Sequence, residues 1–320
     1  MKQIVVVLFL AATAGRAEML RLEASVDAMG STFSVILYDE SRSRMEAAAE
    51  EAFAEVRRLD LMLSNYRAGS ELSEVNRNAA TRPVKVTPEL FSLLQTCLGF
   101  SRASGGAFDI TVGPLMKVWG FYKGSGRLPH RAEIRGVLTR IGYKNILLDE
   151  ENRTVSFARQ GVELDPGGIG KGYAVDKLAE KLRETDIKTA LVTASGSSIF
   201  GMGSPPGEKG WKVNIRDPKR ASQHVETIYL HDESMSTSGN YEKFFRAEGK
   251  LYSHIMDPRT GYPAPGMLSV SVIAAKTLDS EAWTKPMFIN GRLWAAQQKL
   301  EGMRVFFCED KVNQPCGWLQ

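Results

Sequence analysis

The sequence predicts an α+β protein with mixed, largely antiparallel sheets and helices packed against them. Stretches of alternating apolar and polar residues, typical of strands, recur without the regular strand–helix–strand alternation of a parallel sheet. The chain has 320 residues, of which 43% are hydrophobic, and it can therefore bury a large core. We expect residues 18–320 to form one domain, built as two intimately packed lobes.

The individual elements follow from local patterns along the chain. A strand pair is expected over residues 22–38, with an interruption at Met29-Gly-Ser31, and a helix over residues 41–63. Thr87 as N-cap and Pro88 at the first helical position predict a helix over residues 87–103. The other expected elements are helices over 132–141 and 172–185, a hairpin over 145–157, and strands over 189–193, 211–215, 227–230 and 268–275.

The first residues are typical of an export signal. Met1-Lys-Gln3 precedes an apolar run over residues 4–12, and the small residues Ala14 and Ala17 follow. This run is too short for a committed membrane-spanning helix and predicts a signal peptide over residues 1–17. No cysteine precedes Cys97, so lipid attachment to an N-terminal cysteine is not expected. A periplasmic or otherwise extracytoplasmic location is predicted.

Charge and cysteine content narrow the class of protein. Lys and Arg number 41 against 37 Asp and Glu, and the basic residues are scattered, so nucleic-acid binding is not expected. Cys308 and Cys316 flank a polar segment between two apolar runs, and an exported chain could join them across a terminal hairpin. Cys97 lies on an apolar helical stripe and is expected to be a buried thiol.

The stretch over residues 163–176 is a candidate anion site. Gly168, Gly170 and Gly172 allow a tight turn, while Lys171 and the N-terminus of the following helix supply positive charge. The stretch lacks the Ser or Thr that follows the lysine of a P-loop, and its glycine spacing differs from the dinucleotide fingerprint. A plain strand-to-helix turn is the competing interpretation.

Three other polar stretches are candidates for a site. Residues 63–76 carry Tyr66 as their single aromatic side chain, and a surface loop is the simpler interpretation. Asp109, beside paired glycines, is suited either to cap backbone amides or to accept a hydrogen bond from a ligand. His254, in a stretch bounded by prolines, is either a structural residue or a base that works near neutral pH.

Five separated blocks together resemble one family. The blocks are Met29-Gly-Ser31 and residues 63–76, 106–121, 165–176 and 236–263. Their order resembles that of the ApbE family of FAD:protein FMN transferases. Each block alone is weak evidence, whereas the ordered set is specific and spans nearly the whole chain after residue 17.

The resemblance implies an activity, a ligand and a partner. It implies an exported enzyme that binds FAD with Mg²⁺, transfers FMN to a Ser or Thr hydroxyl of a target protein, and releases AMP. Such flavinylation targets are flavin-carrying subunits of membrane redox complexes, which also implies peripheral membrane association. Two alternatives stay open: a non-catalytic FAD-binding protein, and an FAD pyrophosphatase in which water replaces the target hydroxyl.

The resemblance also implies a set of residues around the ligand. Those implied on the flavin side are Met29, Tyr66, Ala107, Phe108 and Asp109. Those implied at the adenosine, the diphosphate and the reacting phosphate are Asp165, Lys171, His254 and Ile255. The chemistry agrees, because Tyr66 offers a stacking face, Lys171 a charge for phosphate oxygens, and His254 a general base for the hydroxyl proton.

The implied metal site departs from the family pattern. The family holds Mg²⁺ with an Asp and a Thr four residues later, and these positions here carry Glu281 and Lys285. Backbone oxygen from the glycine turn, at Gly168 to Gly170, is the other implied ligand. The carboxylate of Glu281 is a suitable ligand, whereas protonated Lys285 is not. The pair could instead form an ion pair one helical turn apart, or Lys285 could neutralise the diphosphate itself.

Overall fold

A central sheet of eight strands organises the chain, in the order β1-β2-β6-β7-β10-β15-β16-β17. The computed structural model describes residues 19–311 and 316–319, so the predicted signal peptide lies outside the described residues. All neighbouring strands of the sheet are antiparallel, as expected for the predicted class. The strands are β1 (Leu20–Ala28), β2 (Ser31–Asp39), β6 (Thr189–Ala194), β7 (Ser198–Met202), β10 (Glu233–Gly239), β15 (Met267–Ala274), β16 (Arg304–Glu309) and β17 (Cys316–Trp318).

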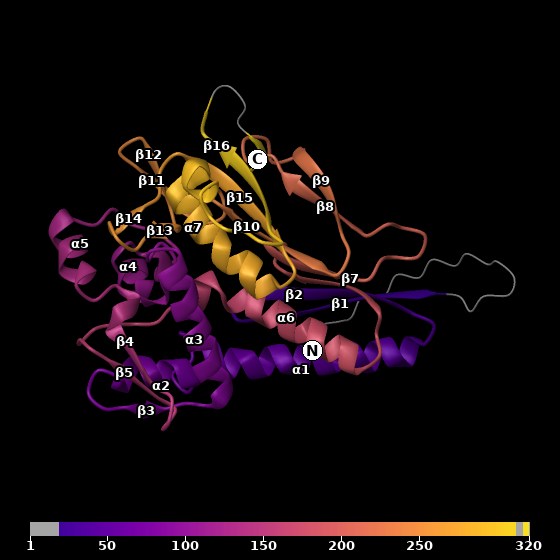
Figure 1. Ribbon diagram of the computed structural model, residues 1–320, viewed down its shortest axis with the longest axis horizontal. Coiled ribbons are helices and arrows are strands. Elements are labelled where there is room, and N and C mark those ends of the chain that lie inside the picture. The colour runs from indigo at the N-terminus through magenta and orange to yellow at the C-terminus, as the bar shows by residue number, and fades with distance from the viewer. Residues whose placement is uncertain (1–18, 312–315, 320) are drawn as a thin grey trace, which may run out of the picture.

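Three long helices cover one face of this sheet (Figure 1). They are α1 (Arg42–Leu63), α6 (Gly170–Glu184) and α7 (Thr277–Ala295). Strand β2 shows why they pack there, because its alternate residues Phe33, Val35 and Leu37 are fully buried beneath α1 and α6. The hairpin of β8 (Trp211–Arg216) and β9 (His224–Leu230) packs on the opposite face.

The remaining elements gather at one end of the sheet, on the left in Figure 1. The helices there are α2 (Glu71–Asn78), α3 (Pro88–Ala103), α4 (Gly113–Val118) and α5 (Arg131–Leu138), with short 3-10 turns η1 (Ile110–Val112), η2 (Phe121–Lys123), η3 (Tyr143–Asn145) and η4 (Pro166–Gly168). The small sheets are β3 (Val84–Lys85), β5 (Thr154–Phe157) and β4 (Ile146–Asp149), then β11 (Phe244–Ala247) with β12 (Lys250–Ser253), and β13 (Met256–Asp257) with β14 (Tyr262–Pro263). The division into two lobes stays a prediction.

Two sequence-based expectations about elements were wrong. The polar stretch over residues 63–76 is not wholly a loop, because α2 begins at Glu71. Ser70 caps this helix, since its hydroxyl accepts from Ser73 N–H. Strand β10 was not predicted, since its run of serines is typical of a loop. Its hydroxyls are buried and bonded: Ser236 pairs with Ser280 of α7 at 2.8 Å. A hydrogen-bonded polar seam thus replaces the apolar contacts that normally mark a strand.

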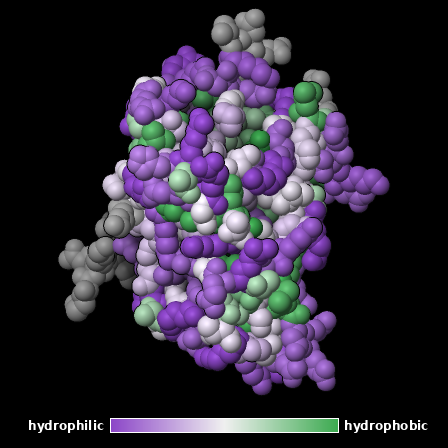
Figure 2. Space-filling view, turned by 90° about the vertical axis from the view of Figure 1, so that its left-hand side faces the viewer, coloured by the Kyte–Doolittle hydropathy of each residue, from purple (hydrophilic) through white to green (hydrophobic). Residues whose placement is uncertain are grey.

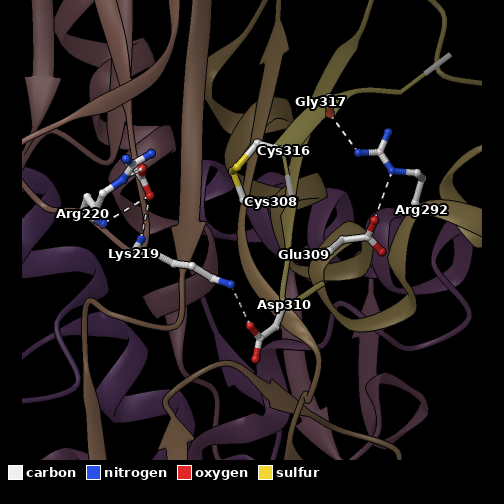
Figure 3. The surroundings of a disulfide bond; sticks show 9 residues. Lys219, Arg220, Arg292, Cys308, Glu309, Asp310, Cys316 and Gly317 are labelled. Carbon is white, nitrogen blue, oxygen red and sulfur yellow. Dashed lines mark hydrogen bonds and ion pairs between the residues drawn. A yellow bond between two sulfur atoms is a disulfide. The ribbon is translucent and has the colours of Figure 1, made fainter. Parts of the chain in front are cut away.

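The disulfide that the sequence made possible is present. Cys308 of β16 and Cys316 of β17 are joined (Figure 3). Cys97 is buried and free. Arg292 of α7 donates to the carbonyl oxygens of Gly317 and Trp318 at 2.9 and 2.7 Å, which ties the terminal strand to the helix.

The face seen from the left-hand side of Figure 1 is mainly hydrophilic, with hydrophobic side chains exposed in small groups (Figure 2). Among the helices of the described part of the chain, none has the length and apolar character to cross a bilayer.

Candidate functional site

A cavity of about 320 Å³ lies where strand ends of the central sheet meet the small elements. The turn between β1 and β2, the turn between β6 and β7, and the end of β10 all contribute to its wall. The glycine turn before α6, the segment after α3, the end of β12 and the middle of α7 complete it. Segments that are far apart in the sequence therefore converge on one site.

Most residues that the resemblance singled out line this cavity. They are Tyr66, Ala107, Phe108, Asp109, Asp165, Gly168, Lys171, His254, Ile255, Glu281 and Lys285. Met29 and Gly170 are not among the lining residues. The methyl carbon of Met29 lies 3.4 Å from the position that a Cβ on Gly170 would occupy, so these two residues pack against each other. The roles of all these residues toward a ligand stay predictions.

Two turns beside the cavity hold unfavourable backbone conformations. Met29 and Ser195 have φ values of 52° and 48°, in the left-handed region that non-glycine residues seldom adopt. Hydrogen bonds retain both turns: Met29 N–H donates to Asp60 at 3.2 Å, and Thr32 N–H donates to the Ser195 hydroxyl at 3.1 Å. Strained residues of this kind cluster at functional sites.

Aromatic side chains form the rim and the floor of the cavity. Tyr66 is 74% exposed at the rim, and its ring lies against that of Tyr122 with centroids 5.6 Å apart. Asn65 donates to the Tyr122 hydroxyl at 2.9 Å and fixes that ring. Phe108 is only 2% exposed and belongs to the floor. The exposed face of Tyr66 offers a planar ligand a ring to stack on.

Two carboxyl groups, buried Asp109 and half-buried Asp165, cap the backbone around the cavity. Asp109 accepts from the backbone and hydroxyl of Thr111 at 2.8 and 2.6 Å and from Tyr143 N–H, so its capping role is observed. Asp165 accepts from Gly167 N–H at 2.7 Å. Burial raises the pKa of both the Asp109 and the Asp165 carboxyl.

The N-terminus of α6 differs from the open anion cradle that its glycines predict. Glu281 of α7 accepts the N–H of Gly172, so the protein's own carboxylate takes one of the unpaired amides of the helix. A Cβ on Gly172 would lie 2.5 Å from the Thr277 carbonyl oxygen, so only glycine allows this approach of α6 and α7. Positive charge at the site therefore comes mainly from side chains.

Two lysines share the Glu281 carboxylate. The Nζ atoms of Lys171 and Lys285 lie 3.9 and 3.7 Å from the same oxygen of Glu281, whose side chain is 3% exposed. Burial lowers the pKa of the Lys285 ammonium to about 8, although the Glu281 carboxylate opposes that shift. At neutral pH the group is thus two ammonium ions around one carboxylate.

His254 is held as a neutral base. Its Nδ1 lies 3.1 Å from the Lys243 carbonyl oxygen, which can only accept, so Nδ1 carries the proton and Nε2 is free to accept another. Burial, reinforced by the charges of Lys171, Lys243 and Lys285, lowers the pKa of His254 to about 4, against a weaker opposing effect of that hydrogen bond. The ring is therefore unprotonated at neutral pH.

The residues at the implied metal position do not fit Mg²⁺. Mg²⁺ requires near-octahedral oxygen ligation, yet the Glu281 oxygens already face a backbone amide and two ammonium groups. The neighbouring Thr284 hydroxyl is already engaged, because it donates to the Glu281 carbonyl at 2.7 Å and accepts from Ser238 at 2.8 Å. Within residues 19–311 and 316–319, no three His, Cys, Asp or Glu side chains form a metal cluster.

Several lining residues were missed by the sequence-based interpretation. Tyr122 follows one of the matched blocks directly, so a wider block would have included it. Lys243 lies within the matched block over residues 236–263 but was not singled out, because a lysine in a polar turn is most often a solvated residue. The position of both residues depends on contacts between distant segments.

Comparison with known proteins agrees with this geometry. The ApbE family model matches residues 29–307. An FAD:protein FMN transferase of Klebsiella pneumoniae is 34% identical over 81% of this chain and 79% of its own length, and one of Treponema pallidum is 32% identical over 87% and 81%. The crystal structure of an ApbE protein of Thermotoga maritima superposes with a TM-score of 0.83 at 31% identity, covering 91% of this chain and 94% of its own.

A second solved structure extends the comparison to a protein named for flavin transfer. The apo form of the Pseudomonas stutzeri flavinyl transferase ApbE has a TM-score of 0.82 at 26% identity, with 94% of this chain and 95% of its own covered. The family match spans most of the chain, and the relatives match over more than three quarters of their length. The chain belongs to the ApbE family of FAD:protein FMN transferases, enzymes that transfer flavin to protein.

Proposed function

We propose that this protein transfers FMN from FAD to a Ser or Thr hydroxyl of an acceptor protein and releases AMP. The observation that carries the proposal is the neutral His254, with Nε2 free, in the same cavity as Lys171 and Lys285. A base and positive charge are the two requirements for attack of a hydroxyl on a phosphate. Mg²⁺ has no part in the proposed step, because the residues do not fit it.

The proposed binding mode follows from the distribution of side chains in the cavity. The flavin would lie toward the aromatic rim of Tyr66 and Tyr122, and the diphosphate toward Lys171 and Lys285. Stacking on an aromatic face and charge-assisted hydrogen bonds to phosphate are suited to these two ends of FAD. His254 would then face the phosphate next to the flavin.

The chemical step is a substitution at phosphorus. The acceptor's hydroxyl oxygen forms a bond to the FMN phosphorus, and the bond from that phosphorus to the bridging oxygen breaks, so that AMP leaves with its electron pair. Nε2 of His254 takes the hydroxyl proton. With a pKa near 4 the free ring is a weak base; the negative diphosphate raises that pKa and strengthens the base once FAD is bound. Such a transfer depends on positioning and charge neutralisation.

Incubation with an acceptor domain and FAD tests the proposal. The acceptor mass should increase by one FMN, AMP should appear in equal amount, and a His254→Gln variant should form far less adduct while still binding FAD. Absence of adduct with any plausible acceptor would reject transferase activity. FMN and AMP released without acceptor would identify a pyrophosphatase. This control is needed because Tyr66 is exposed, so water can reach the cavity at its rim. FAD retained intact would identify a binding protein.

We also propose an extracytoplasmic location, with an acceptor that belongs to a membrane redox complex and peripheral contact with the membrane. The Cys308–Cys316 disulfide supports this location, because disulfides persist in oxidising compartments. The predicted signal peptide points the same way. Fractionation of cells that express the full chain should recover the disulfide-bonded protein outside the cytoplasm, and a reduced cytoplasmic protein would contradict the location.

A further inference from the structure

We propose that Lys171 and Lys285 together hold the FAD diphosphate in place of a divalent cation, so that FAD binding in this protein does not need Mg²⁺. This inference deepens the proposed function and rests on it. It concerns the anion end of the cavity, which is formed by the start of α6 and the middle of α7.

The two ammonium groups are held in place. Both contact one oxygen of Glu281, at 3.9 and 3.7 Å, and Lys285 Nζ also donates to the Glu281 carbonyl oxygen at 3.1 Å. The other carboxylate oxygen of Glu281 accepts from Gly172 N–H, which fixes the carboxylate to the backbone of α6. Each ammonium has three donors, so N–H groups remain for a ligand in the cavity that both lysines line.

The packing of α7 makes this arrangement specific. The Lys285 side chain is 21% exposed and that of Lys171 30% exposed, so both are partly shielded from water, where charge-assisted hydrogen bonds are stronger. The Thr284 hydroxyl is bonded to Ser238 of β10 and to the Glu281 carbonyl oxygen, and Thr284 is not among the lining residues. Lys285 is therefore the residue of this helical turn that reaches the ligand space beside Glu281.

The charges favour a diphosphate over a dication. Around the Glu281 carboxylate, Lys171 and Lys285 give a local surplus of one positive charge. The other charged lining residues are Asp109 and Asp165, which accept from backbone amides, and the exposed pair Glu242 and Lys243. This surplus attracts the two negative charges of a diphosphate and repels Mg²⁺. A cation at Glu281 would also have to displace both lysines from the carboxylate.

FAD titration with and without metal tests the inference. The purified protein is stripped with EDTA, and FAD affinity is measured by fluorescence quenching in EDTA and in millimolar MgCl₂. We expect the two dissociation constants to agree within about twofold, and the FAD complex to carry no stoichiometric magnesium in elemental analysis. A loss of about tenfold or more in EDTA would overturn the inference while leaving the proposed function intact. No FAD binding in either buffer would reject both.

A lysine variant gives a second measurement. Lys285→Thr should weaken FAD binding in EDTA by about tenfold to a hundredfold, as expected for the loss of a charge-assisted hydrogen bond. Lys299→Thr, which alters an exposed lysine outside the cavity, is the control and should bind like the wild type. A folded Lys285→Thr protein with wild-type affinity in EDTA would overturn the inference. If the variant does not fold, the metal comparison on the wild type decides alone.

Discussion

Gly172→Ala is the sharpest test of how the anion end is built. Gly172 lies in the first turn of α6 and touches α7. An added Cβ would lie 2.5 Å from the Thr277 carbonyl oxygen and 2.8 Å from a Glu281 carboxylate oxygen. Neither neighbour is free to move, because Thr277 begins α7 and Glu281 is bonded to Gly172 itself. The substitution must push the two helices apart.

The expected cost has three parts. Overpacking at a rigid contact costs about 1–3 kcal/mol. Loss of the hydrogen bond to the buried carboxylate costs about 1.5–3 kcal/mol. The higher helix propensity of alanine stabilises the folded protein by about 1 kcal/mol and offsets part of this cost. The free energy of unfolding should therefore fall by roughly 1.5–5 kcal/mol, which corresponds to a loss of roughly 2–8 °C in melting temperature for a chain of this size.

Urea unfolding and FAD titration measure the two consequences. Gly99→Ala is a matched control, because Gly99 lies inside α3 and a Cβ there meets no atom within 4 Å. That variant should gain about 0.5–1 kcal/mol from helix propensity and leave FAD affinity unchanged. Gly172→Ala should lose both stability and FAD affinity, since Glu281 no longer orients the two lysines.

The direction of the stability change in each variant tests this reasoning. If Gly172→Ala is as stable as the wild type and binds FAD as tightly, the close approach of α6 and α7 is not what fixes Glu281. If both glycine variants lose stability equally, the loss does not come from this contact.

Three further predictions concern the base and the terminal hairpin. His254→Gln should lower the FMN transfer rate by about 10²–10⁴ with FAD affinity unchanged, and a rate near wild type would remove His254 as the base. The pKa of His254 is lowered to about 4 in the folded protein, so protonation of this ring favours the unfolded chain. Urea unfolding should therefore show that stability falls by roughly 1.4 kcal/mol per pH unit as the pH drops from about 6.5 towards about 4. An equal loss in the His254→Gln variant would mean that another group causes the pH dependence. Cys308 and Cys316 are 8 residues apart in the sequence, and reduction of their disulfide should lower the free energy of unfolding by about 2–3 kcal/mol. The loss is measured as a lower melting temperature in dithiothreitol. An unchanged melting temperature would mean that Arg292 alone holds β17.

Local signals predicted those parts of the fold that local interactions stabilise. The helix over 87–103 was predicted from its cap, and Thr87 does accept from Leu90 N–H at 3.3 Å. The strand pair around Met29 was predicted from alternation, and its two strands pair in register. Both depend on residues that are neighbours in the sequence, so the information lies within one window.

Strand β10 and the anion end could not be predicted in this way. The hydroxyl of Ser236 is satisfied by Ser280, 44 residues later, and the amide of Gly172 by Glu281, 109 residues later. A run of polar residues can form a buried strand when distant residues bond its side chains. The N-terminus of a helix is open to an anion when no other part of the chain occupies its free amides. Most of the residues that the family resemblance singled out line the cavity, because a family pattern carries these distant contacts implicitly, whereas the place of Lys243 in the wall needed the structure itself.

Glu281 links the structural and the chemical sides of the site. It caps α6 through Gly172, and its carboxylate is the common partner of Lys171 and Lys285. A carboxylate that orients two ammonium groups cannot also present open oxygens to a metal without releasing them. Lys285 and the carboxylate of Glu281 are therefore one feature: the acid orients the two lysines that we propose neutralise the ligand, and the glycine at 172 lets α6 and α7 approach closely enough for it to do so.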